Sequence, residues 1–171
     1  MDTMKITFII VCAAIAIFIL LIKKYSMDDS NRYDERQVAM RSKAYKFGFG
    51  TVLAYNVLYY LATAIFFEKP LMQDGIAPMV GVCLGLVVFA IECIRNDAFF
   101  SIRQNPWVYM LLCLIVVLSN GYVSFQNIRD GLLIKDGLMT ESCLQPIITV
   151  TFLIIIIAII VKLIFSREEE E

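Results

Sequence analysis

Long apolar runs separated by short polar segments make up the hydrophobic pattern of this chain. Five runs are long enough, or nearly so, to cross about 30 Å of hydrocarbon at about 1.5 Å per residue. They cover residues 6–22, 47–67, 76–94, 107–125 and 146–165. Each run must be helical, because an unpaired backbone group in lipid costs too much free energy. The pattern therefore predicts an all-α polytopic membrane helix bundle with about five transmembrane helices.

The polar segments divide the chain into four predicted regions: an N-terminal anchor (1–22), a basic segment with a helix start (23–46), a four-helix region (47–165) and an acidic tail (166–171). We expect the first run to be an anchor and not a cleaved signal, because Lys23 and Lys24 follow it and no small-x-small cleavage site does. The four helices would form two hairpins, since the second and third, and the fourth and fifth, are joined by segments with Asp-Gly turns.

Basic residues gather on one predicted side of the membrane. Seven Lys and Arg residues lie in 23–46, two in 95–106 and two near the C-terminal end, which makes 11 against 4 on the other side. Loops rich in Lys and Arg remain in the cytoplasm. We therefore expect a multi-pass protein of the cell membrane with its N-terminus outside, its C-terminus in the cytoplasm, and its basic segment against anionic lipid headgroups.

The stretch "YDERQVAMRSKAYKFGFG", residues 33–50, predicts a helix that begins before the membrane. Asp34 and Gln37 have the spacing of a capping box, and neither proline nor glycine follows until Gly48. A helix from about 35 to 67 would be about 50 Å long, which exceeds the hydrocarbon thickness. Its start is either a solvated surface that touches lipid or a docking surface for a cytosolic partner or for the acidic tail.

The connection "IRNDAFFSIRQNPW" predicts a short interfacial helix over residues 96–104. Asp97 would cap this helix, and two phenylalanines would give it an apolar face. Asn105 would cap the next transmembrane helix, with Pro106 in its first position.

Three polar side chains lie within or at the end of predicted spans: Asn56, Glu92 and Asn120. Amides in a membrane usually form hydrogen bonds between helices. Glu92 has Arg95 and Asn96 within one helical turn, which favours a local ion pair. The alternative is an intramembrane polar site on a path for an ion or a small solute.

Gly81 and Gly85 form a G-x-x-x-G motif in the third apolar run. This motif is typical of helices that approach each other closely. The close contact could lie within the chain or between two copies of it.

Composition excludes most catalytic chemistry. Of the 171 residues, 60% are hydrophobic and none is histidine, so the usual general base and the commonest metal ligand are missing. The five cysteines form no C-x-x-C pair. Neither a nucleotide-binding loop nor a nucleophile with a neighbouring base is present. We predict no catalytic, cofactor-binding or metal-binding residue, and the net charge of −1 gives no indication of nucleic-acid binding.

Residues 33–105 resemble a group of small multi-pass membrane proteins of Gram-positive bacteria that are catalogued as domains of unknown function. The group carries an Asp-Glu-Arg-Gln stretch before a span, matched here by residues 34–37. It also carries a short Asp-aromatic stretch after a later span, matched by residues 97–100. The resemblance implies a membrane location and a helical fold, and it brings no activity. The last two spans and the acidic tail lie outside it.

These patterns favour a non-enzymatic regulatory, sensory or accessory subunit that acts through its cytoplasmic face. The candidate partner-binding residues are Asp34, Glu35, Arg36, Gln37 and Asp97. The alternative is a small oligomeric transporter or channel that uses Asn56, Glu92 and Asn120. The expected partners are the lipid bilayer and another membrane or cytosolic protein, with a second copy of the chain as a further candidate.

Overall fold

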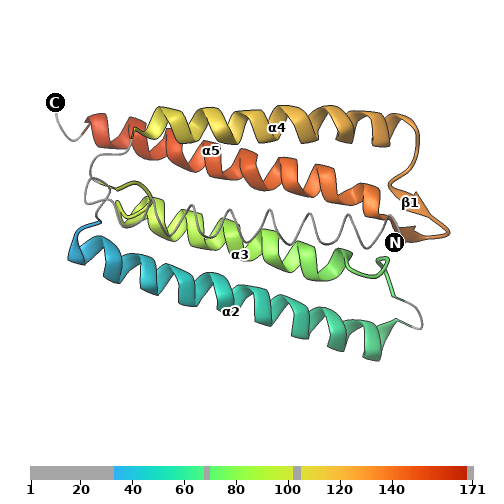
Figure 1. Ribbon diagram of the computed structural model, residues 1–171. Coiled ribbons are helices and arrows are strands. Elements are labelled where there is room, and N and C mark those ends of the chain that lie inside the picture. The colour runs from blue at the N-terminus through green and yellow to red at the C-terminus, as the bar shows by residue number, and fades with distance from the viewer. Residues whose placement is uncertain (1–32, 68–69, 102–104, 169–171) are drawn as a thin grey trace, which may run out of the picture.

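The computed structural model describes residues 33–67, 70–101 and 105–168 and consists mainly of four long helices (Figure 1). The helices are α2 (Glu35–Phe66), α3 (Ile76–Arg95), α4 (Pro106–Arg129) and α5 (Leu144–Glu168). Each is long and apolar enough to cross a membrane. Four of the predicted spans are therefore confirmed as helices, whereas residues 6–22 lie outside the described part of the chain.

Polar side chains begin two of these helices as predicted. The Asp34 carboxylate accepts a hydrogen bond from the backbone N–H of Gln37 at 2.5 Å, and the Gln37 side chain accepts from the Asp34 N–H at 3.3 Å. Asn105 caps α4 by accepting from the Trp107 N–H at 3.0 Å, with Pro106 in the first position, where a helix needs no N–H donor. Both predicted caps are confirmed.

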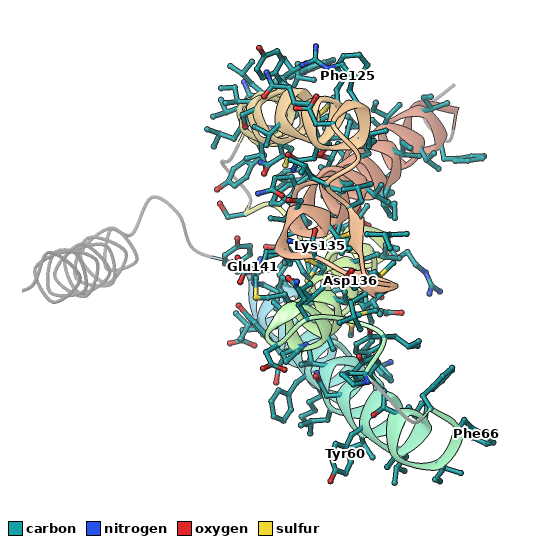
Figure 2. All side chains as sticks on the ribbon, turned by 90° about the vertical axis from the view of Figure 1, so that its right-hand side faces the viewer. Tyr60, Phe66, Phe125, Lys135, Asp136 and Glu141 are labelled. Atoms are coloured by element: carbon teal, nitrogen blue, oxygen red, sulfur yellow. The ribbon has the colours of Figure 1, made fainter. Side chains whose placement is uncertain are left out.

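The four helices form a layer one helix thick, in the order α2, α3, α5, α4 (Figure 1). Seen from one end, they stack as a curved column (Figure 2). α2 packs on α3, α3 on α5, and α5 on α4, so that two antiparallel hairpins lie side by side. We call the end with the start of α2 and the end of α3 the charged end, and the opposite one the hairpin end.

Glycines set the distance between α2 and α3. Gly48, Gly81 and Gly85 are all buried in this contact. A Cβ atom added at Gly85 would lie 2.7 Å from the carbonyl oxygen of Gly48 and would also meet the Val52 side chain. The absence of side chains therefore lets the two backbones approach closely. The G-x-x-x-G motif serves a contact within the chain.

Apolar packing and hydrogen bonds join the two hairpins and their helices. Ala90 and Ile94 of α3 form a buried cluster with Ile155 and Ile159 of α5. The Asn127 amide of α4 donates to the Ser142 carbonyl oxygen just before α5 at 3.2 Å and to the side-chain oxygen of Gln145 in α5 at 3.4 Å. α3 and α5 thus form the centre of the layer, and α2 and α4 its edges.

A small antiparallel sheet at the hairpin end was not predicted. It consists of β1 (Ile134–Lys135) and β2 (Leu138–Met139), and the short 3₁₀ helix η2 (Glu141–Cys143) follows it. Asp136 and Gly137 join the strands with φ angles of +53° and +77°, as a type I′ turn requires. Figure 2 looks onto this end, where Lys135 and Asp136 lie between the edges of the layer. The predicted Asp-Gly turn is confirmed here, and the strands that it connects are new.

The sheet also bonds to the connection between α2 and α3. The Met139 N–H donates to the Leu71 carbonyl oxygen at 3.0 Å, and the Met139 carbonyl oxygen accepts from the Gln73 N–H at 2.9 Å. These backbone hydrogen bonds tie the first helical hairpin to the second. The hairpin end is therefore joined by backbone contacts between residues that lie far apart in the sequence.

The prediction of an interfacial helix over residues 96–104 is wrong for residues 96–101, which form turns and bends in the structure. Asp97 ends α3 instead of starting a helix, since its φ angle is +53°. The Ala98 N–H donates to the Cys93 carbonyl oxygen at 2.8 Å, and the Asp97 N–H to that of Ile94 at 3.3 Å. This pair of bonds is the Schellman arrangement, in which aspartate is one of the few residues that can replace glycine.

The predicted acidic tail is described only in its first residues. α5 continues to Glu168, three residues beyond the predicted end of the last span at 165. Residues 169–171 lie outside the described part of the chain, and so does any contact between the tail and α2.

Large apolar side chains cover the outside of the layer. Tyr60 and Phe66 on α2 and Phe125 on α4 are 71%, 78% and 66% exposed (Figure 2). Soluble proteins rarely expose contiguous apolar surface on this scale. Four long helices with such surfaces are typical of a multi-pass membrane protein.

Candidate functional site

The two sequence motifs lie against each other at the charged end. The Gln37 amide nitrogen donates to the carbonyl oxygens of Asp97 at 2.7 Å and of Phe100 at 3.2 Å. The oxygen of the same amide completes the cap of α2. One side chain therefore caps the start of α2 and ties that helix to the connection between α3 and α4.

Arg41, one turn further along α2, contacts the two carbonyl groups in between. Its Nη1 atom donates to the carbonyl oxygens of Ala98 at 3.0 Å and Phe99 at 3.3 Å. Its guanidinium also lies 4.3 Å from the centre of the Tyr33 ring, within the range of a cation–π contact. Burial raises the pKa of the Tyr33 hydroxyl, which Arg41 partly opposes, so the phenol is neutral at physiological pH.

These carbonyl groups need donors because the chain leaves helical geometry at Asp97. In an α-helix, each carbonyl accepts from the N–H four residues later, whereas residues 97–101 form no helix. A buried polar group without a partner costs about 1–3 kcal/mol. Gln37 and Arg41 supply side-chain donors to all four carbonyl oxygens of residues 97–100.

The side chain of Asp97 extends the contact to α5. Its carboxylate lies 3.1 Å from the ammonium nitrogen of Lys162, and both side chains are partly exposed. A partly exposed ion pair contributes about 0–1 kcal/mol to stability. We call Gln37, Arg41, Asp97 and Lys162 the junction cluster, since it connects α2, the end of α3 and α5.

The five predicted partner-binding residues fall into two groups. Asp34, Gln37 and Asp97 form hydrogen bonds or ion pairs within the chain. Glu35 and Arg36 are exposed, and neither side chain has a hydrogen bond or an ion pair with another residue that the structure describes. Their binding of a partner stays a prediction.

Sequence reasoning missed two members of the junction cluster. Arg41 lies four residues after Gln37, so both must lie on one face of α2, and this spacing was a usable signal. Lys162 lies 65 residues from Asp97, and nothing in the sequence pairs them.

The two asparagines within the helices bond to their own backbones. The Asn56 side chain donates to the Val52 carbonyl oxygen at 2.8 Å, and that of Asn120 donates to Val116 at 3.0 Å. These bonds within helices replace the expected bonds between helices. Asn56 nevertheless lies in the α2–α3 contact, because a Cβ atom added at Gly81 would be 2.5 Å from its amide nitrogen.

Glu92 forms the ion pair with Arg95 that the sequence predicted. Its carboxylate lies 3.2 Å from the Arg95 guanidinium, and Asn96 donates to its carbonyl oxygen at 2.7 Å. This group lies in the last turn of α3, at the charged end.

The structure does not bring the predicted intramembrane residues together. Asn56 lies on α2 and Asn120 on α4, the two edges of the layer, with α3 and α5 between them (Figure 1). Glu92 lies near the end of α3. Transport by these three residues stays a prediction that no contact between them supports.

Other evidence for a function is sparse. Among the described residues, no three His, Cys, Asp or Glu side chains lie close enough to hold a metal ion. Comparisons with protein-family models, curated proteins and solved structures found no match. The resemblance to a bacterial membrane family therefore stays a prediction, although its two motifs are in direct contact here.

Proposed function

We propose that this chain is a non-enzymatic regulatory, sensory or accessory membrane subunit that acts by contact through its charged end. The observation that carries this proposal is the junction cluster, which fixes the start of α2 against residues 97–100. A fixed helix start holds Glu35 and Arg36 in a defined place on the surface. Two adjacent side chains of opposite charge, held in this way, suit a complementary charged pair on another protein.

Charge distribution supports a cytoplasmic position for this surface. Of the eight Lys and Arg side chains that the structure describes, six lie on the charged-end side. They are Arg36, Arg41, Lys43, Lys46, Arg95 and Lys162. Arg129 and Lys135 lie at the hairpin end. Such an excess of basic residues favours the cytoplasmic side of a cell membrane.

Affinity purification of the full-length chain with a double variant tests the proposal. Glu35→Ala with Arg36→Ala removes both exposed charges and leaves Gln37 and its hydrogen bonds in place. We expect at least one protein that copurifies with the wild type to be lost. The matched control is Lys135→Ala with Asp136→Asn, an adjacent pair of opposite charge at the hairpin end, which should keep every partner. Identical partner lists for the wild type and the Glu35/Arg36 variant would refute a contact at this surface.

A further inference from the structure

A small cavity lies at the charged end, between the end of α3 and the last turns of α5. Its volume is about 190 Å³, and its lining combines Asp97 and Lys162 with five aliphatic or aromatic side chains. Sites for drug-sized ligands measure about 300–1,000 Å³. The cavity is therefore suited to one compact polar group and not to a large ligand.

The two opposite charges of the cavity favour a ligand that carries both a positive and a negative charge. The Asp97 carboxylate and the Lys162 ammonium lie 3.1 Å apart, and 59% and 34% of these side chains are exposed. A free anion that approached Lys162 would be repelled by Asp97, and a free cation that approached Asp97 would be repelled by Lys162. A zwitterion avoids both penalties, because its cation can bind Asp97 while its anion binds Lys162.

The apolar part of the lining suits an ammonium group and a hydrocarbon chain. Phe99 and Phe100 both line the cavity, with ring centres 4.9 Å apart in an edge-to-face arrangement. The face of an aromatic ring attracts an ammonium group. Leu163 lines the same cavity and is exposed, which provides apolar surface along α5 beside the charges.

The cavity lies where lipid headgroups are expected. α3, which is long and apolar enough to span a membrane, ends at Arg95, two residues before Asp97. Trp107, in the first turn of α4 at the same end of the layer, is 68% exposed. Tryptophan and basic side chains at the end of a transmembrane helix are typical of the headgroup region.

From the paired charges, the aromatic lining and this position, we propose that the cavity binds the headgroup of a zwitterionic phospholipid with a primary ammonium. The lipid phosphate binds Lys162 and its ammonium binds Asp97, while the acyl chains follow α5 from Leu163 towards Ile160 and the middle of the helix. The site needs no protein partner, so it can be tested independently of the function proposed above.

Native mass spectrometry of the full-length protein in detergent tests this site with three phospholipids that have identical acyl chains. We expect phosphatidylethanolamine to bind about tenfold more tightly than phosphatidylglycerol, which has no ammonium. Phosphatidylcholine should also bind less tightly, because its quaternary ammonium has no N–H donor for the carboxylate. Equal affinity for the ethanolamine and glycerol lipids would overturn the proposal.

Two single substitutions and a matched control locate the site. Asp97→Asn keeps a residue that tolerates a positive φ angle, and Lys162→Gln keeps a long side chain. Each should lower the affinity for phosphatidylethanolamine about tenfold. Asp97→Asn should also abolish the preference over phosphatidylglycerol, because it removes the partner of the ammonium, whereas Lys162→Gln should weaken the binding of both lipids and keep the preference. The control removes another exposed ion pair, Arg129 and Asp130 at 3.1 Å, and should change neither. Unchanged affinity in both single variants would show that the lipid binds elsewhere.

Two measurements on the wild type make the test independent of how the variants fold. A phosphatidylethanolamine with a photoreactive group near its headgroup should cross-link to peptides that contain Phe99, Phe100 or Leu163. Cross-links spread evenly over α2 and α4 would contradict the site. Free phosphoethanolamine should not displace the lipid, and displacement at equal concentration would identify a soluble ligand and overturn the assignment to a lipid.

Discussion

At the scale of single residues, Gln37 satisfies backbone groups of two separate elements. Its amide oxygen accepts from the Asp34 N–H at the start of α2, and its nitrogen donates to two carbonyl oxygens after α3. Helix ends leave such groups without partners inside the helix. The stability of the fold therefore accounts for Asp34 and Gln37 in the Asp-Glu-Arg-Gln stretch. It does not account for the exposed Arg36, and it accounts for Glu35 only because a carboxylate in the first turn of a helix is favourable.

Replacement of Gln37 should destabilise the protein more than replacement of its neighbour. We expect Gln37→Ala to lower the free energy of unfolding by about 1–3 kcal/mol, because backbone carbonyl oxygens lose their donor. Arg36→Ala should change it by no more than about 0.5 kcal/mol, since Arg36 is exposed. Denaturation of both variants in detergent micelles measures the difference. Equal stabilities would mean that the Gln37 hydrogen bonds do not hold the charged end together.

At the scale of the elements, the contact between α2 and α3 depends on backbone proximity at Gly85. We expect Gly85→Ala to lower the free energy of unfolding by about 1–3 kcal/mol, because its Cβ atom would overlap Val52 and the Gly48 carbonyl oxygen. Gly50→Ala is the control, since no atom lies within 4 Å of a Cβ atom added there. Thermal unfolding in detergent compares them, and a Gly85→Ala variant as stable as Gly50→Ala would contradict the observed packing.

Patterns that repeat over many residues predicted the elements better than single residues did. The four helices follow from apolar runs that leave no other structure possible in lipid. The β1–β2 hairpin has strands of two residues, too short for any alternation of polar and apolar positions to appear. Asp97 led to a wrong prediction because aspartate is favoured at two different positions. It caps the start of a helix, and it is also one of the few residues besides glycine that adopt the left-handed conformation at a helix end.

The sequence predicted only part of the candidate site, because some of its contacts join residues that lie far apart in the chain. Asp34, Gln37 and Asp97 stood out as members of short motifs, and a spacing of four residues pointed from Gln37 to Arg41. The pairing of Lys162 with Asp97 depends on how the second hairpin packs against the first. No local pattern contains that information.

At the scale of the whole molecule, the four described helices form a layer one helix thick, with two broad faces and two edges (Figure 1). α3 is the most buried of the four helices, and α2 and α4 at the edges are the least buried. Among the four long helices that the structure describes, α2 and α4 each have only one neighbour, so the side that faces away from it is available to lipid or to another protein.

Cysteine labelling in intact cells tests the central claim, namely that four helices cross the membrane with the charged end in the cytoplasm. Single cysteines are placed at Ser42 of α2 and at Lys135 of β1, both exposed, in a chain whose five native cysteines are replaced. We predict that a membrane-impermeant maleimide labels position 135 in intact cells and position 42 only after permeabilisation. Labelling of position 42 from outside, or equal labelling of both positions in intact cells, would contradict the account.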